Sequence, residues 1–154
     1  MKVPGHRRWV AIALLLLFAA PLGARAEWAA NGQNEVPLDG NGHSWFVRAT
    51  LNGNVTGLFL LDTGASMCVI GPETARRLNL PPSAQQVELR TANGVVRAPV
   101  VQLRSVDVGG NRARDVQAVV HGAIGPPLDG IIGLSYLNHF SYGVDPRRRV
   151  LRLR

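Results

Sequence analysis

The sequence predicts an all-β domain of many short strands with one or two short helices. Short runs of β-branched, aromatic and aliphatic residues recur between Gly, Pro and Asn positions. Asn-Gly pairs at 52–53 and 93–94 indicate hairpins, because type I′ turns need positive φ at both central residues. Only residues 72–80 carry clear helix signals before the C-terminal third. The length of 154 residues suits a single domain.

The first 26 residues have the features of a secretory signal peptide. Three basic residues fall within the first eight, an apolar run spans 9–20, and Ala24-Arg25-Ala26 provides an A-x-A cleavage site. The run is short for a bilayer span, which needs about 20 residues. We therefore expect cleavage after Ala26 and an exported protein, periplasmic or secreted. The alternative is an uncleaved signal whose residues 9–24 anchor the protein in the inner membrane, its only expected membrane contact.

The net charge of +7 is unevenly distributed along the chain. Four of the 17 basic residues lie in the first 26 residues and five in the last eight, so residues 27–146 contain eight basic and ten acidic residues. A segment of this composition has no basic face large enough to indicate nucleic-acid binding, and we expect no nucleic-acid partner. The single cysteine, Cys68, excludes an intrachain disulfide and a Cys-based zinc site.

The first elements follow from local signals. Residues 27–42 are polar and rich in Gly and Asn, which predicts a flexible lead-in to a domain over 43–154. Residues 44–51 and 55–61 are expected to form two strands around the first Asn-Gly turn. The second of these strands ends in four consecutive apolar residues, which favours burial on both of its faces.

The remaining elements are predicted by the same kind of signal. Pro72 and Glu73 suit the first turn of a helix, and Arg76 and Arg77 its last turn. Pro81-Pro82 ends that helix. The other expected elements are strands over 67–70, 87–91, 95–101, 101–108, 113–120 and 151–153, and a short helix over 134–139.

Asp62-Thr63-Gly64 is the strongest chemical signal in the sequence. A carboxylate directly after a wholly apolar strand is costly to place, and the Thr hydroxyl and Gly N–H beside it can fix its orientation. Taken alone, the tripeptide is explained equally well as a turn that closes a strand. Two further features favour a functional site: Ala65-Ser66 precedes another apolar strand, and Gly130-Ile131-Ile132-Gly133 follows much later, before a short helix.

In this order and spacing, these segments resemble the retropepsin-like aspartic proteases, in particular small exported bacterial forms. The resemblance runs from His43 to Leu153 and includes residues 59–66 and 129–137. Leu134 and Tyr136 stand where relatives often have Met and Phe, and Cys68 is unusual. The resemblance implies a retropepsin-like acid protease fold, a closed β-barrel-like domain that is active as a homodimer.

The resemblance further implies an aspartic endopeptidase that cleaves extended polypeptide segments without a metal or organic cofactor. Such enzymes use two carboxylates that share one proton, because like charges about 3 Å apart cannot both ionise. The chain has one Asp-Thr-Gly, so the second Asp62 must come from a second copy across a two-fold axis. By the same resemblance, Thr63 braces the pair across the interface and Gly64 orients the carboxylate. Ala65, Ser66, Ile131, Ile132 and Gly133 support the catalytic loop.

The hairpin over residues 87–100 is the expected flap, which closes over a bound peptide and excludes water. Its tip consists of Thr91, Ala92, Asn93 and Gly94. Without Asp62 upstream, the same hairpin would be read as a common surface turn. A second hypothesis also remains open: a catalytically inactive peptide-binding or dimerisation module of the same fold in the periplasm.

Overall fold

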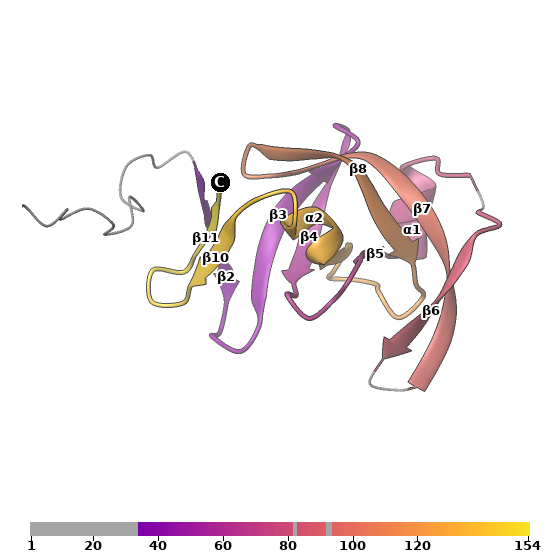
Figure 1. Cartoon of the computed structure of the whole chain (residues 1–154), viewed down its shortest axis with the longest axis horizontal. Helices are drawn as coiled ribbons and strands as arrows, with labels where there is room; N and C mark the ends of the chain where they lie inside the picture. The colour runs from indigo at the N-terminus through magenta and orange to yellow at the C-terminus, as the bar shows by residue number, and fades with distance from the viewer. Residues whose placement is uncertain (1–33, 82, 92–93) are drawn as a thin grey trace, which may run out of the picture. The chain divides into compact units, whose positions relative to one another are not determined.

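Eleven strands and two short helices make up the described part of the chain, residues 34–81, 83–91 and 94–154 of a computed structural model (Figure 1). The strands are β1 (Glu35–Pro37), β2 (Asp39–Gly40), β3 (Trp45–Leu51), β4 (Val55–Leu61), β5 (Cys68–Ile70), β6 (Gln86–Thr91), β7 (Gly94–Val108), β8 (Asn111–Val120), β9 (Gly130–Ile132), β10 (Tyr142–Asp145) and β11 (Val150–Leu153); the helices are α1 (Pro72–Arg77) and α2 (Leu134–Leu137).

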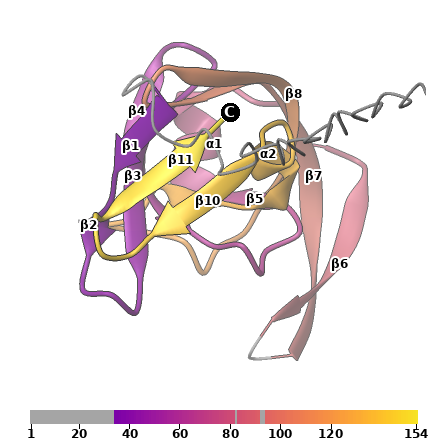
Figure 2. The ribbon, with the colours of Figure 1, turned by 60° about the vertical axis from the view of Figure 1, so that its left-hand side comes forward.

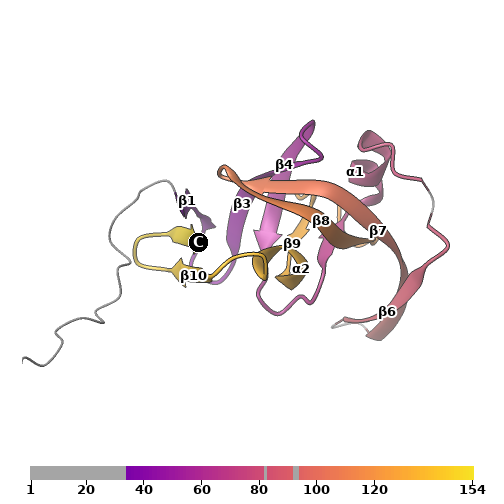
Figure 3. The same ribbon diagram turned by 45° about the horizontal axis from the view of Figure 1, so that its top comes forward.

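Six of these strands close into a barrel (Figure 3). Hydrogen-bonded neighbours follow the order β3–β4–β9–β5–β8–β7, and β7 returns to β3 through the pairs Thr50↔Asp107 and Leu51↔Val106. The β4–β9 and β5–β8 pairs are parallel and the other four are antiparallel. The predicted all-β class, with a closed retropepsin-like barrel and two short helices, is confirmed.

The barrel is filled by a continuous cluster of apolar side chains. Phe59 of β4, Leu103 of β7 and Tyr136 of α2 are among its largest fully buried members. The Tyr136 hydroxyl donates a hydrogen bond to the Asn111 carbonyl oxygen at 2.7 Å, which satisfies the one polar group of that side chain. Burial raises the pKa of Tyr136 well above its usual range.

The longest strand, β7, belongs to two substructures. Its second half forms part of the barrel wall, whereas its first half pairs with β6 in a hairpin that extends away from the barrel (Figures 1 and 3). The hairpin register runs from Gln86↔Pro99 to Thr91↔Gly94. This is the segment that the sequence predicts as a flap; the tip residues Ala92 and Asn93 lie outside the described residues.

Several predicted boundaries differ from the structure: the strands expected over 95–101 and 101–108 form one strand, β7, and the helix expected over 134–139 ends at Leu137. Two further differences have a clear physical cause. The second part of the expected lead-in forms β1 and β2, because Val36 and Leu38 bury their side chains in the core despite the polar composition around them. Helix α1 ends three residues before the predicted end at 80. Asn79 adopts a left-handed conformation with φ of 51°, which stops the helix.

The predicted signal peptide, residues 1–26, lies outside the described residues. Across the part of the chain that is described, none of the helices has the length and apolar character needed to cross a bilayer.

The C-terminal strand β11 lies between β1 and β10 in a separate three-stranded sheet (Figure 2). Arg148 forms a bidentate pair with Glu35 at 2.6 and 2.8 Å, and Arg152 bonds Glu35 at 3.1 Å and Asp145 at 3.0 Å. These hydrogen bonds hold the pKa of Glu35 below its usual range, first through Arg148 and then through Arg152. The backbone N–H of Arg148 is the main cause of the lowered pKa of Asp145. Part of the Arg-rich tail is therefore an ion-pair network that ties β1 to the end of the chain.

We expect Glu35→Gln to lower the thermal unfolding temperature at neutral pH. A carboxyl with a lowered pKa stabilises the folded state above its unfolded pKa, about 4.3 for Glu, and this contribution is lost as the pH falls through the folded value. The difference from the wild type should therefore shrink in acid and disappear once Glu35 is protonated. Circular dichroism melts over a series of pH values measure it.

The matched control for this prediction is Glu88→Gln on the hairpin. Glu88 pairs with Arg97 at 3.3 Å, but the two side chains are 63% and 74% exposed, and such pairs contribute little to stability. Equal melting shifts for the two variants, or a Glu35 effect that does not change with pH, would contradict the stabilising role of the network.

Candidate active site

Asp62 leaves the barrel directly after β4 and is held by backbone groups. Its N–H donates to the Ile132 carbonyl oxygen at 3.0 Å, and its own carbonyl accepts from the Ala65 N–H at 3.3 Å. The Gly64 N–H donates to Asp62 Oδ1 at 2.8 Å. In the described part of the chain, Oδ2 has no hydrogen-bond partner and no Arg or His forms an ion pair with Asp62. The carboxylate is thus oriented at one oxygen and open at the other.

Residues 63–66, the segment directly after Asp62, form an arch over the end of β9. Gly133 lies under this arch, where an added Cβ would come within 2.5 Å of the Met67 carbonyl oxygen and 2.7 Å of that of Ala65. The Leu134 N–H donates to the same Ala65 oxygen at 2.8 Å. Only glycine fits at position 133 without moving the loop. The structure therefore brings together Asp62, Gly64 and Ala65 with the predicted supporting segment of β9.

The other predicted supporting residues occupy two different environments. Ile131 pairs with Leu60 on one side and with Val69 on the other, so it lies between β4 and β5. Thr63 and Ser66 are solvent-exposed on the arch, and their hydroxyl groups make no hydrogen bond within the described residues. The exposed hydroxyl groups leave this face of the loop free for contacts outside the single chain.

Sequence reasoning missed Ser135, which ties three elements together behind the arch. Its hydroxyl donates to the Gln117 carbonyl oxygen of β8 at 2.7 Å and accepts from the Cys68 N–H of β5 at 2.8 Å. The Gly133 N–H lies 3.5 Å from Cys68 Sγ, to which it donates. Burial raises the pKa of the Cys68 thiol, consistent with a small buried side chain rather than a nucleophile. A serine in a short helix carries no local signal of these distant partners.

Asp129 was also missed, because its sequence context lacks the Asp-Thr-Gly pattern. It precedes β9 and contacts both β4 and α1: Leu58 donates its N–H to Asp129 Oδ2 at 2.9 Å, and Arg77 bonds Oδ1 at 2.9 Å. These partners are 71 and 52 residues away in sequence, so no local pattern could have identified them.

A satellite apolar cluster joins the Asp62 loop to the hairpin. Ala98, Val100 and Val119 are buried in it, and the partly buried members packed against them are Met67, Val69, Val87 and Leu89. Met67 and Val69 follow the arch, whereas Val87 and Leu89 come from β6. An apolar wall therefore runs from just beyond Asp62 onto the hairpin.

Gly94, where β7 begins beside the hairpin tip, has a backbone conformation that favours glycine. Gly94 has φ of 114°, which L side chains rarely adopt, and it pairs with Thr91 across the hairpin. Val95, the next residue, is 61% exposed and is the large hydrophobic side chain that stands out on the described surface.

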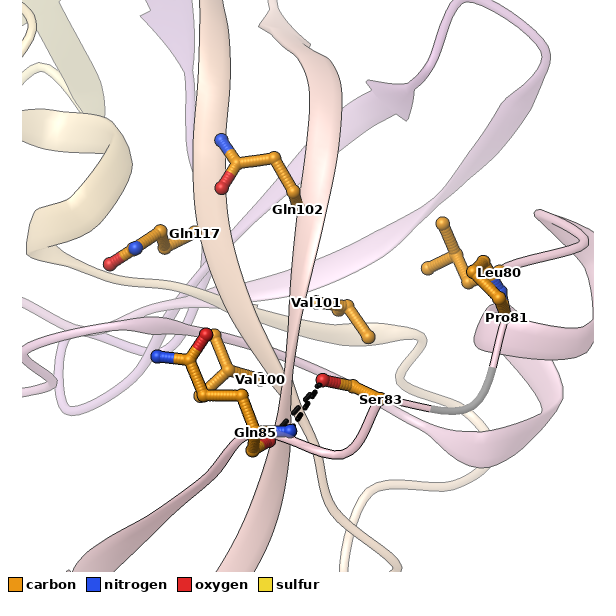
Figure 4. A pocket seen from close by; sticks show the side chains of 8 residues that line it. All are labelled: Leu80, Pro81, Ser83, Gln85, Val100, Val101, Gln102 and Gln117. Atoms are coloured by element: carbon orange, nitrogen blue, oxygen red, sulfur yellow. Dashed lines mark hydrogen bonds between the residues drawn. The ribbon is translucent and has the colours of Figure 1, made fainter.

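A groove of about 400 Å³ lies where the hairpin leaves the barrel (Figure 4). The Val100 N–H donates to the Gln85 carbonyl oxygen at 2.8 Å at this point. The groove lining contains no charged residue and no residue of the Asp62 loop: Leu80, Pro81, Ser83, Gln85, Val100, Val101, Gln102 and Gln117. This space is separate from the candidate catalytic carboxylate.

No group of three or more His, Cys, Asp or Glu side chains is placed to hold a metal ion within residues 34–81, 83–91 and 94–154.

Comparison with known proteins gives three findings. The aspartyl protease family matches residues 47–136. An uncharacterized protein in the cobV 5′ region of Sinorhizobium sp. is 33% identical over 129 residues, which cover 81% of this chain and 54% of that protein; the chain thus spans about half the length of this relative. The crystal structure of a retropepsin-like aspartic protease from Rickettsia conorii is similar with a TM-score of 0.59 and 25% identity, covering 77% of this chain and 89% of that one.

The matched family segment contains the Asp62 loop, the β6–β7 hairpin and β9 with its glycines, which are the parts that form the candidate site. On this match the chain belongs to the aspartyl protease family and has a retropepsin-like fold.

Proposed function

We propose that this protein is an aspartic endopeptidase that hydrolyses peptide bonds in extended polypeptide segments. The observation that carries the proposal is the orientation of the Asp62 carboxylate. Its Oδ1 accepts the Gly64 N–H at 2.8 Å, whereas within the described residues its Oδ2 has no hydrogen-bond partner and no cation pairs with the group. A carboxylate held in this way can share a proton with a second carboxylate and bind a water between them.

The second carboxylate is proposed to be Asp62 of a second copy of the chain. Several other carboxylates of the domain are engaged elsewhere, with Asp129 paired to Arg77, Asp107 to Arg112 and Asp145 to Arg152. The exposed arch, with the free hydroxyl of Thr63, supports an assembly in which two such loops meet at a two-fold axis.

In this assembly the ionised carboxylate takes a proton from the bound water, and the protonated one polarises the scissile carbonyl. No metal or organic cofactor takes part. The apolar wall from Met67 to Leu89 supports a preference for apolar side chains near the scissile bond, and the hairpin supports closure over an extended chain. The features of residues 1–26 support action outside the cytoplasm, with polypeptides there as substrates.

Asp62→Asn should abolish the activity. We expect residues 27–154 to cleave an unstructured polypeptide at mildly acidic pH, and the variant to be at least about a hundredfold slower, because an amide cannot act as the general base. Peptide release measured by mass spectrometry between about pH 4 and 7 tests this. Asp115→Asn is the control: this exposed aspartate lies on β8 with φ of 55°, which Asn tolerates.

Equal cleavage by the wild type and Asp62→Asn would overturn the proposal. Absence of cleavage by a wild type shown to be dimeric would do the same, and would favour a peptide-binding or dimerisation module.

Association of two copies should become tighter as the pH falls. Two Asp62 carboxylates about 3 Å apart hold one proton between them, so that assembly from two ionised chains takes up a proton. The dimer dissociation constant is then expected to fall by up to about tenfold per pH unit on going from neutral to mildly acidic pH. Sedimentation over a dilution series measures the dissociation constant at each pH.

Asp62→Asn is the matched comparison, since it removes both charges and should leave association nearly independent of pH over this range. The same pH dependence in both proteins would argue against a shared proton. A strictly monomeric wild type that still cleaves would argue against the two-copy site.

A further inference from the structure

We propose that Asp129 is a positioning residue for Asp62: it fixes the register between β4 and β9, and thereby the point at which the catalytic carboxylate leaves the barrel. The inference rests on the proposed function of Asp62, but the placement it describes can be measured without any activity.

Apart from the glycines at 130 and 133, where an added Cβ would overlap neighbouring atoms, the residues of this strand pair specify its register weakly. The parallel pairing consists of three residue pairs, Phe59↔Gly130, Leu60↔Ile131 and Leu61↔Ile132. Register in a sheet is normally set by alternation of apolar and polar residues. Here every side chain in the paired segments is apolar, so alternation gives little discrimination between one alignment and another.

Asp129 adds a polar contact that fixes the alignment of β9 with β4 at the start of the pair. Its N–H donates to the Leu58 carbonyl oxygen at 2.8 Å, and its Oδ2 accepts the Leu58 N–H at 2.9 Å. One residue thus satisfies both backbone groups of Leu58. Because the side-chain bond requires a carboxylate in register with Leu58, a shifted pairing would leave this partly buried N–H unsatisfied, which is unfavourable.

The same residue is anchored on its other side by the helix region. Arg77 bonds Oδ1 at 2.9 Å, and the Asp129 carbonyl oxygen accepts from the Gly71 N–H at 3.1 Å and from the Thr74 hydroxyl at 3.0 Å. Thr74 is the buried polar residue of the described domain. With partners on β4 and α1, Asp129 cannot move without breaking several hydrogen bonds at once.

The Asp129 carboxylate packs directly against the backbone of Gly57. A Cβ built on Gly57 would overlap the carboxyl carbon and Oδ2 of Asp129. The absence of a side chain at position 57 therefore makes room for the contact, and Gly57→Ala displaces the carboxylate without altering residue 129.

The contact between Asp129 and Leu58 affects the position of Asp62 at the other end of the β4–β9 pair. Asp62 lies four residues beyond Leu58, about 13 Å along an extended strand, and its N–H bonds the Ile132 carbonyl oxygen at 3.0 Å. A change of register or of strand spacing at Leu58 is carried directly to that bond. Misplacement of a reacting group by about 1 Å can cost a hundredfold in rate.

The test introduces Asp129→Asn into residues 27–154 and makes two measurements. An amide has one acceptor oxygen and cannot serve both Leu58 and Arg77. We expect kcat for peptide cleavage to fall by about tenfold or more with KM nearly unchanged. Hydrogen exchange followed by NMR should show the Asp62 amide exchanging at least about tenfold faster.

The matched control is Asp107→Asn. Asp107 also accepts one backbone N–H, from Gly110 at 2.8 Å, and one Arg bond, from Arg112 at 3.3 Å. Its side chain is 20% exposed, against 24% for Asp129. The control should lose a similar amount of thermal stability while leaving kcat and exchange at Asp62 unchanged.

Gly57→Ala gives an independent check. It should reproduce the effects of Asp129→Asn, and the double variant should be little worse than either single variant, since both act on one contact. Unchanged exchange at the Asp62 amide in Asp129→Asn, or equal effects of Asp129→Asn and Asp107→Asn on kcat, would overturn the positioning role. A wild type without protease activity would overturn the proposed function instead, and faster exchange at Asp62 in Asp129→Asn would still support the placement.

Discussion

The hydrogen bond from the Asp62 N–H to the Ile132 carbonyl oxygen is the constraint on which the site depends. It continues the parallel pairing of β4 with β9, a strand that lies between β4 and β5 although these two are neighbours in sequence. The segment from Asp62 to Met67 must therefore cross the end of β9 at close range. This crossing explains Gly133, where a Cβ would press on the arch. At the other end of β9, a Cβ at Gly130 would overlap the Val69 carbonyl oxygen of β5 and the Phe59 ring of β4.

Asp62 also differs from the carboxylates that bind arginine in the partners it lacks. Glu35, Asp107, Asp129 and Asp145 each bind an arginine, and each links parts of the fold. Asp62 is oriented by a backbone amide alone among the described residues. An amide fixes the direction of a carboxylate without neutralising its charge, so the group keeps its capacity to exchange a proton.

Local features of the fold could be predicted from the sequence, whereas distant contacts could not. The Asn52-Gly53 turn, the apolar strand before Asp62 and the helix starting at Pro72 all depend on neighbours within a few residues. The insertion of β9 between β4 and β5, and the bonds of Asp129, depend on partners more than 50 residues away. The strand at Val36 was missed because two apolar side chains in a polar segment give too weak a signal. Two of the five C-terminal arginines, Arg148 and Arg152, pair with Glu35 from the other end of the domain, a contact that no local pattern indicates.

The enclosure of β11 has a consequence for assembly. Both of its edges are occupied by strands of the same chain, β1 and β10, so β11 itself has no free edge to pair with another copy. In the proposed two-copy enzyme, the subunits could therefore separate and associate again while β11 stays paired within its own chain. In a population of mixed chains, copies would then exchange between pairs, and a subunit with a defective carboxylate would inactivate each pair that it joins. In that assembly, sensitivity to inactive copies would follow from how the two ends of the domain are folded together.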